Sequence, residues 1–229
     1  MNIALVLAGG KGTRMGGEKP KQYIECDNKP ILIHTLEAFA YHNEIDKICV
    51  ICPAENIDYT REIVSEYKVP KVEWILPGGN TRRDSSFIGV SKIFSECAPD
   101  DIILIHDAAR PNISSSIISN NIQMATEHGA CETVIPSQDT IAVSEDGQTI
   151  SAIPDRSKLF NVQTPQSFKA EIIYKAHVDF EKSADGQVTD DAALVLRNGG
   201  KVFIVQGDKM NLKITTQEDL RILYNVTTR

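Results

Sequence analysis

The residues best suited to chemistry lie in one glycine-rich stretch near the start of the chain, LAGGKGTRMGGEKPKQ at positions 7–22. An apolar run at 3–7 ends in Gly9 and Gly10, and cations follow among further glycines: Lys11, Arg14, Lys19 and Lys21. Glycine lets a backbone approach a ligand closely and turn successive N–H groups toward an anion, and lysine and arginine add charge beside phosphate oxygens. We interpret the stretch as a phosphate-binding loop after a strand, with a plain surface loop as the alternative.

Neither familiar phosphate-binding motif is present in this loop. A dinucleotide fingerprint, G-x-G-x-x-G, begins at Gly10 but meets Met15 where its last glycine belongs. The P-loop pattern fails because Gly17 is followed by Glu18 rather than by lysine. The loop therefore predicts phosphate binding by a different arrangement of glycines and cations.

Length and charge limit the class of protein. The chain has 229 residues, 41% of them hydrophobic and 24% charged, which fits a single α/β domain over residues 1–229. Its net charge of −7 argues against a nucleic-acid partner. The cations of the first loop therefore indicate a small-anion site within an acidic protein.

The cysteines and apolar segments favour a cytoplasmic location. Cys49 and Cys52 have C-x-x-C spacing but fall within an expected strand, where residues three apart face opposite sides. We therefore expect buried, reduced thiols rather than a metal or redox pair. The N-terminus does not resemble a signal peptide, and no apolar run reaches the roughly 18 residues of a membrane span, so we expect no membrane association.

Strand and helix patterns alternate along the chain. Apolar runs predict strands at 3–7, 47–52, 72–76, 101–105, 131–135 and 201–205. Helical spacing predicts helices at 30–41, 57–67, 82–95, 114–127, 171–180, 190–197 and 217–225. This alternation is typical of an α/β fold with a mostly parallel, twisted sheet and helices on both faces, in which ligands bind at the carboxyl ends of the strands.

The segment 137–161 breaks this rhythm. Its apolar residues nearly alternate on either side of Asp146 and Gly147, which is a hairpin signal. A hairpin inserted in a wound sheet would protrude as an arm. Because a two-stranded ribbon is marginal alone, we expect it to pack against a second subunit and to make a homodimer.

Four further polar stretches follow expected strands or precede expected helices. They contain Arg82, in GGNTRRDSS; Asp107 and Arg110, in HDAARP; Arg156, which is followed by QTPQ; and Lys213, in the stretch that runs from TDD at 189–191 to NLKITT at 211–216. A surface turn, a helix cap or a local ion pair is the alternative for each, and His106 alone fits a structural histidine better than a base. The inventory lacks a nucleophile–base pair and a zinc set but is rich in cations. It therefore favours phosphoryl or nucleotidyl transfer, in which the substrates supply nucleophile and leaving group.

Six motifs in order and spacing resemble one known family. LAGGKGTRMGGEKPKQY, GGNTRRDSS, HDAARP, DRSKLFNVQTPQ, TDDA and NLKITTQEDL resemble the methylerythritol phosphate cytidylyltransferase family, which includes ribitol phosphate cytidylyltransferases. The resemblance covers nearly the whole chain. It implies a Rossmann-like α/β enzyme that uses CTP and a small polyol phosphate, with Mg²⁺ on the triphosphate oxygens, and that dimerises through a protruding β-arm.

The resemblance also implies roles for individual residues. Arg14 and Lys21 would stabilise charge as pyrophosphate departs. Lys213, with Arg156 from a partner subunit, would hold the acceptor phosphate. The nucleotide would be bound by Leu7, Ala8, Gly9, Gly10, Gly12, Gly79, Asn80, Ser85 and Ala108, with Arg82 expected beside them. The acceptor site would be lined by Asp107, Arg110, Thr140, Thr164 and Thr189.

The motifs that would select the acceptor resemble two different groups of the family. Ala142 follows Asp139-Thr140-Ile141 where the methylerythritol group usually has lysine, and Ile153-Pro154-Asp155-Arg156 resembles the I-P-x-R of ribitol phosphate enzymes. The HDAARP and TDDA motifs look more like the methylerythritol group, so methylerythritol phosphate is the favoured acceptor, with ribitol or another capsular polyol phosphate as the alternative. A sugar-1-phosphate nucleotidyltransferase and a non-catalytic nucleotide-binding regulator are further alternatives.

Overall fold

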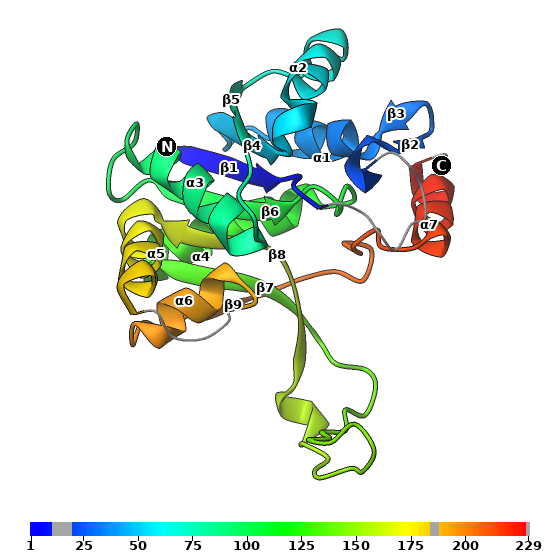
Figure 1. Ribbon diagram of the computed structural model, residues 1–229, viewed down its shortest axis with the longest axis vertical. Coiled ribbons are helices and arrows are strands. Elements are labelled where there is room, and N and C mark those ends of the chain that lie inside the picture. Colours follow the sequence, from blue (N-terminus) through cyan, green and yellow to red (C-terminus); the bar gives the residue numbers. More distant parts are fainter. Residues whose placement is uncertain (11–19, 184–187, 228–229) are drawn as a thin grey trace.

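The computed structural model describes residues 1–10, 20–183 and 188–227. Within these ranges, a seven-stranded sheet in the order β5-β4-β1-β6-β8-β7-β9 forms the centre of the molecule (Figure 1). Its strands are β1 (Asn2–Leu7), β4 (Lys47–Cys52), β5 (Val72–Pro77), β6 (Ile102–Asp107), β7 (Ala130–Pro136), β8 (Phe160–Lys169) and β9 (Phe203–Gln206). The helices are α1 (Ile31–Ala40), α2 (Ile57–Glu66), α3 (Arg82–Phe94), α4 (Ser115–His128), α5 (Ala170–Ser183), α6 (Asp191–Arg197) and α7 (Gln217–Thr227).

Side chains of the central strands alternate between two buried layers. Ala4 and Val6 of β1 pack in one hydrophobic cluster with α1, α2 and α4, whereas Ile3 and Leu5 pack in the other with α3, α5 and α6. Both faces of β1 are fully covered, which explains its uninterrupted apolar sequence. The predicted α/β fold with helices on both faces is therefore confirmed.

The strand order places a ligand-binding crevice beside β1. Successive connections run from β1 to β4 and β5 on one side, and then cross to β6 on the other side of β1. The order thus reverses between β1 and β6, and ligands of such sheets bind outside the carboxyl ends of the strands at this point. Leu7 at the end of β1 lies opposite Asp107 at the end of β6.

One strand of the sheet was not predicted. β8 runs antiparallel to both of its neighbours, β6 and β7, whereas the other neighbouring pairs of the sheet are parallel. Its sequence, FNVQTPQSFK, has polar residues and Pro165 where a central strand is normally apolar. Buried partners compensate for this composition: Thr133 Oγ1 donates to the carbonyl of Pro165 at 2.7 Å, and the register shifts between Glu132 and Val134.

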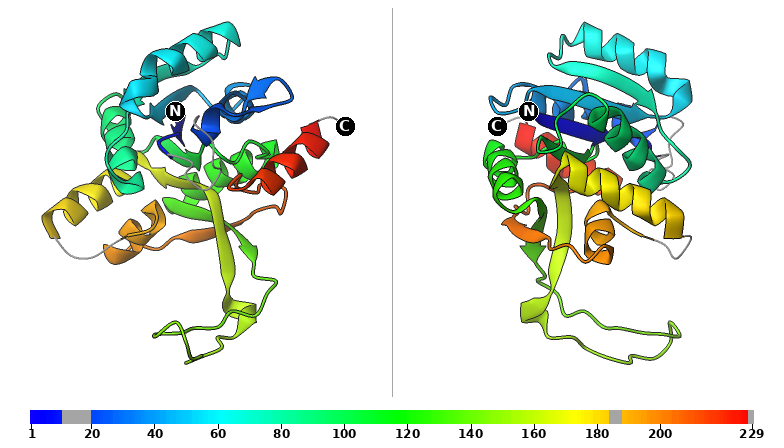
Figure 2. Two further views of the ribbon diagram at one scale, coloured as in Figure 1. Left: turned by 45° about the vertical axis from the view of Figure 1, so that its right-hand side comes forward. Right: turned by 90° about the vertical axis from the view of Figure 1, so that its left-hand side faces the viewer.

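The segment 137–159, here called the arm, protrudes from the body as predicted (Figure 2). The expected two-stranded ribbon is wrong in detail, since one isolated bridge, Val143 to Ala152, joins its two sides. The turn lies where it was predicted, and the Asp146 carboxylate accepts the backbone N–H groups of Gln148 and Thr149 at 2.8 Å each. A regular ladder does not form because the arm's apolar side chains have no layer to pack on in one chain: Ile150 is 67% exposed and Ile153 63%.

Both cysteines of the C-x-x-C spacing are buried, and they lie in different hydrophobic clusters on opposite faces of β4. The prediction that Cys49 and Cys52 cannot share a ligand is confirmed. None of the helices in the described part of the chain is long and apolar enough to cross a bilayer.

Candidate active site

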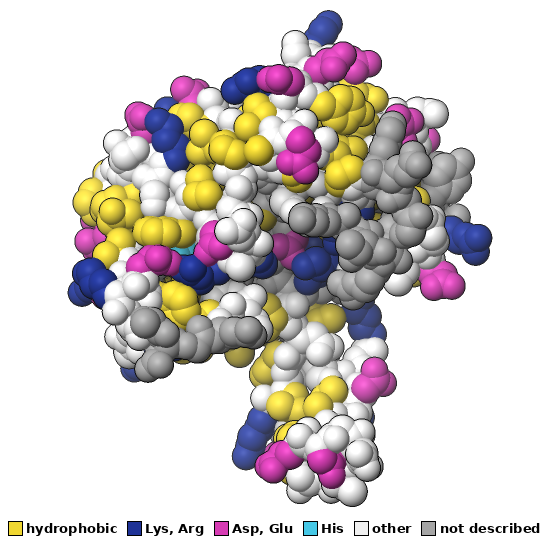
Figure 3. All heavy atoms as spheres, in the orientation of Figure 1, with side chains coloured by type: hydrophobic (Ala, Val, Ile, Leu, Met, Phe, Trp, Pro, Cys, Tyr) yellow, Lys and Arg dark blue, Asp and Glu magenta, His cyan; other side chains and the backbone are white. Residues whose placement is uncertain are grey.

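A cavity of about 450 Å³ opens at the carboxyl ends of β1, β5 and β6. It brings together most of the residues predicted to bind nucleotide, and Lys and Arg side chains lie beside acidic ones in the middle of the face in Figure 3. The predicted residues that line it are Leu7, Ala8, Gly9, Gly10, Lys21, Gly79, Asn80, Arg82, Ser85, Asp107, Ala108 and Lys213. Gln22, Thr81 and Ala109 line it as well and were not predicted.

The loop after β1 contributes backbone and one lysine. A Cβ at Gly10 would lie 3.7 Å from Cε of Lys21, so the lysine stem runs along the glycine backbone. Lys21 Nζ donates to the carbonyl of Ile214 at 3.1 Å, and buried Gln22 donates to the carbonyl of Ala8, which holds the two ends of the loop together. Two predicted residues of this loop, Gly12 and Arg14, lie outside the described residues.

The loop after β5 is held by a capping box. Thr81 Oγ1 accepts the N–H of Asp84 at 3.1 Å, and the Asp84 carboxylate accepts the N–H of Thr81 at 3.1 Å, so α3 begins at Arg82. Gly79 allows this loop to approach α3 closely, because an added Cβ would lie 2.4 Å from Cβ of Asp84. The segment is therefore a helix cap and a cavity wall at once.

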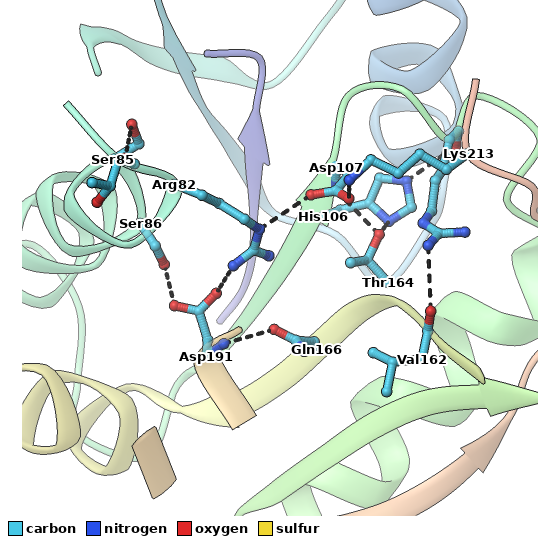
Figure 4. A network of polar contacts seen from close by, with 12 residues as sticks. Arg82, Ser85, Ser86, His106, Asp107, Val162, Thr164, Gln166, Asp191 and Lys213 are labelled. Carbon is cyan, nitrogen blue, oxygen red and sulfur yellow. Dashed lines mark hydrogen bonds and ion pairs between the residues drawn. The ribbon is translucent and has the colours of Figure 1, made fainter. Parts of the chain in front are cut away.

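Charges alternate along one edge of the cavity (Figure 4). The Asp107 carboxylate pairs with Lys213 Nζ at 2.7 Å and with Arg82 Nε at 3.5 Å. Burial alone would raise the pKa of Asp107, but the neighbouring Arg82 and Lys213 cations hold that pKa well below its usual range. Among the described lining residues, three cations therefore face one ionised carboxylate, and the cavity favours an anion.

The segment that carries Lys213 is fixed from two sides. The backbone N–H of Ile214 donates to the carbonyl of Ala109 at 2.8 Å, and buried Asn211 donates to the carbonyl of Thr164 at 2.8 Å. Because these contacts join residues 211–214 to the ends of β6 and β8, Lys213 faces the cavity from a rigid support. No periodic pattern in the sequence predicts this placement.

Two residues predicted for the acceptor site, Thr164 and Arg110, lie outside the cavity lining, beside the histidine His106. Thr164 is 4% exposed, accepts the N–H of Asp107 at 3.1 Å and contacts Nδ1 of His106 at 3.0 Å. His106 is buried, and burial lowers the pKa of its imidazole to about 4, so it is neutral and structural, as its sequence context suggested. Arg110 donates to the carbonyl of Asn211 at 2.8 Å, while its buried Nε has no hydrogen-bond partner.

Three other predicted residues do not reach the cavity of this chain. Thr140 and Arg156 lie in the arm, where Arg156 Nη1 donates to the carbonyl of Gln138 at 3.1 Å. Thr189 is exposed and precedes Asp190, the N-cap of α6. The structure therefore gathers the nucleotide side of the predicted site and leaves part of the acceptor side elsewhere on the molecule.

The fold and the cavity define a class of protein. Glycine backbone and cations at the carboxyl edge of a wound sheet suit the triphosphate of a nucleotide, and the described lining residues include no pairing of a nucleophile with a histidine. In the described part of the chain, no group of three His, Cys, Asp or Glu side chains is placed to hold a metal ion. These features are those of an α/β nucleotidyltransferase, which positions two substrates that react with each other.

Comparisons with known proteins agree. The family model for IspD, 2-C-methyl-D-erythritol 4-phosphate cytidylyltransferase, matches residues 2–227. A relative with that enzyme name from Clostridium botulinum (strain Langeland / NCTC 10281 / Type F) is 40% identical over 220 residues, which are 96% of this chain and 94% of the relative. The chain belongs to the 2-C-methyl-D-erythritol 4-phosphate cytidylyltransferase family.

Solved structures show the same architecture. The crystal structure of 4-diphosphocytidyl-2C-methyl-D-erythritolsynthase from Anaerococcus prevotii DSM 20548 matches with a TM-score of 0.84 at 29% identity, covering 100% of this chain and 96% of that one. A second crystal structure, titled 4-diphosphocytidyl-2C-methyl-D-erythritol synthase, matches with a TM-score of 0.81 at 33% identity, covering 99% and 98%.

Proposed function

We propose that this enzyme transfers CMP from CTP to the phosphate of 2-C-methyl-D-erythritol 4-phosphate and releases pyrophosphate. An acceptor phosphate oxygen attacks the α-phosphorus, the bond from that phosphorus to the bridging oxygen of the β-phosphate breaks, and the electron pair leaves with pyrophosphate. The observation that carries the proposal is that Gly9, Gly10, Lys21 and Lys213 line the same cavity, in a chain of this family.

The nucleotide lies, in this proposal, along the glycine backbone of the first loop. Gly79, Asn80 and Ser85 surround the base, Ala108 leaves room for the ribose, and Lys21 and Arg14 face the triphosphate. Ser85 is already oriented, because its Oγ accepts the N–H of Gly79 at 3.1 Å and donates to the carbonyl of Thr81 at 2.9 Å. Cations aimed at the developing charge stabilise the transition state without having to reorganise.

The acceptor lies, in this proposal, on the Lys213 side of the cavity. Lys213 holds its phosphate, and Asp107, Arg110, Thr164 and Thr189 belong to the acceptor side. No general base is needed, since a phosphate dianion is already the nucleophile. This fits His106, which precedes the lining residue Asp107 in β6 and is buried with both ring nitrogens in hydrogen bonds.

Magnesium fits this site as an ion carried by the triphosphate. Mg²⁺ in such sites is bound through one or two carboxylates and substrate phosphates, and Asp107 is the one acidic residue among the described residues of the cavity lining. When bound, it would neutralise and orient the triphosphate oxygens. The ion would be held mainly through the CTP phosphates, because both Asp107 oxygens already face cations, Lys213 and Arg82.

We also propose that the enzyme is a cytoplasmic homodimer joined through the arm. The arm exposes Ile141, Val143, Ile150 and Ile153, and it carries Thr140 and Arg156 away from this chain's own cavity. In a dimer, Arg156 of the partner subunit would complete the acceptor site. The proposed location follows from the expectation of reduced thiols, and four of the five cysteines are buried.

Pyrophosphate release tests the proposed function. The enzyme, CTP and Mg²⁺ are combined in parallel with methylerythritol phosphate, ribitol phosphate and glycerol phosphate, and with UTP, GTP or dTTP in place of CTP. The expected result is fastest turnover with CTP and methylerythritol phosphate. Faster turnover with ribitol phosphate would show that the acceptor is ribitol phosphate and not methylerythritol phosphate. Binding of CTP without pyrophosphate release would refute an enzymatic role.

A further inference from the structure

Asp191 lies outside the cavity lining but ends the line of charges that leads into it (Figure 4). Its side chain is 1% exposed, and three side chains donate to its carboxylate: Arg82 Nη1 at 2.7 Å, Ser86 Oγ at 2.5 Å and His177 Nε2 at 3.1 Å. Its backbone N–H donates to Gln166 Oε1 at 3.1 Å. A buried carboxylate with this many donors holds each of them in a fixed position.

Arg82 is shared unequally between two carboxylates. Its Nη1 lies 2.7 Å from Asp191, whereas its Nε lies 3.5 Å from Asp107, at the limit of a hydrogen bond. The other Asp107 oxygen is 2.7 Å from Lys213 Nζ. The close partner of Asp107 is therefore Lys213, and the close partner of Arg82 is Asp191.

We propose that Asp191 is a positioning residue that holds Arg82 away from Asp107 and so leaves Asp107 paired with Lys213. Without the Asp191 charge, Asp107 is the remaining carboxylate next to the guanidinium, and arginine forms close two-pronged pairs with carboxylates. Such a pair would displace Lys213 from its fixed position. This inference depends on the proposed function, in which Lys213 holds the acceptor phosphate.

A purely structural role for Asp191 makes a different prediction. The carboxylate joins α3, through Arg82 and Ser86, to α5, through His177, so its loss also weakens helix packing. Weaker packing would persist when Arg82 is changed too. Competition between Arg82 and Lys213 for Asp107 would disappear, because the competing cation is gone. The two roles therefore predict different outcomes for the double variant. Adding Arg82→Gln relieves the defect if Asp191 positions Arg82, and does not relieve it if Asp191 only supports helix packing.

The test compares Asp191→Asn, Arg82→Gln and the double variant by steady-state pyrophosphate release. The KM for methylerythritol phosphate is measured at saturating CTP, so that any loss of nucleotide affinity from Arg82→Gln does not limit the rate. Asp191→Asn is expected to raise this KM about tenfold or more, as expected when one charge-assisted contact is lost. The double variant is expected to return to within about threefold of Arg82→Gln alone. Ser86→Ala is the control, because it removes a donor from the same carboxylate and keeps Arg82 in place.

Each outcome decides the proposal. It is overturned if Asp191→Asn leaves the acceptor KM within twofold of wild type, if the double variant stays as impaired as Asp191→Asn, or if Ser86→Ala raises that KM equally. Should Asp191→Asn fail to fold, the double variant carries the test, since it removes both partners of the buried pair. An acceptor KM more than about tenfold above that of Arg82→Gln would then refute the proposal. A wild-type enzyme without turnover would instead refute the proposed function.

Discussion

Replacing Lys213 by methionine separates its proposed role in the reaction from its contribution to the stability of the fold. Its side chain is 38% exposed and pairs with Asp107 at 2.7 Å, and an ion pair this accessible contributes only about 0–1 kcal/mol to the free energy of unfolding. Asp107 keeps Arg82 as a neighbour, so its carboxylate is not left without a cation. A cation that holds a reacting phosphate contributes far more, and its loss typically costs about 3–4 kcal/mol, or ~10²–10³ in rate.

The expected result is a loss of ~10²–10³ in kcat/KM for the acceptor, with the KM for CTP within about threefold of wild type and a small change in thermal stability. Lys169→Met is a matched control, because Lys169 makes an ion pair of the same length, 2.7 Å to Asp100, outside the cavity lining. Both variants are compared by steady-state kinetics and thermal unfolding. The reasoning is refuted if Lys213→Met binds CTP poorly but keeps its acceptor affinity, or if the two variants behave alike.

Four other perturbations are predicted. Lys21→Ala should lose at least ~10² in turnover while unfolding at the wild-type temperature, and near-normal turnover would exclude its role beside the triphosphate. Gly79→Ala should raise the KM for CTP and cost about 1–3 kcal/mol in stability, since the new Cβ would lie 2.4 Å from that of Asp84; unchanged kinetics would show that the loop can move freely. Burial and the nearby charge of Asp190 raise the pKa of Glu132 from 4.5 to about 7, so its contribution to stability is greatest below pH 4.5 and is lost as the pH rises through 7. Glu132→Gln should therefore raise the melting temperature relative to wild type at pH 8 more than at pH 5, and an equal difference at both pH values would contradict this. Ile150→Asp, at a position 67% exposed on the arm, should leave each chain folded and shift sedimentation from dimer to monomer; an unchanged dimer would place the interface elsewhere.

Much of the fold could be predicted from the sequence because its central strands are covered on both faces. β1, β4 and β6 appear as continuous apolar runs, and the helices between them have a recognisable period. β8 could not be predicted in this way. Buried Gln163, Thr164 and Gln166 make specific hydrogen bonds within the structure, and such pairings depend on tertiary contacts that no local pattern encodes.

The candidate site was predictable where one continuous motif supplies it. Gly9 and Gly10 follow β1, and Asp107 and Ala108 end β6, so strand order alone brings them together. Asp191 was missed because TDDA has the pattern of an ordinary helix start, and Asp190 does cap α6. Asp191 differs from Asp190 in the contacts of its side chain. One of these contacts is with Arg82, which lies 109 residues away in the sequence.

The arm and the cavity wall share one stretch of backbone. β7 leads out of the body into the arm, and β8 leads back beside β6, where Thr164 accepts the N–H of Asp107 at 3.1 Å. The strand that returns from the arm is therefore also the strand that supports the end of β6, where Asp107 lies. A substitution near residue 160, where β8 leaves the arm, is therefore expected to affect both the protruding segment and the cavity wall, although it touches no residue of the cavity lining.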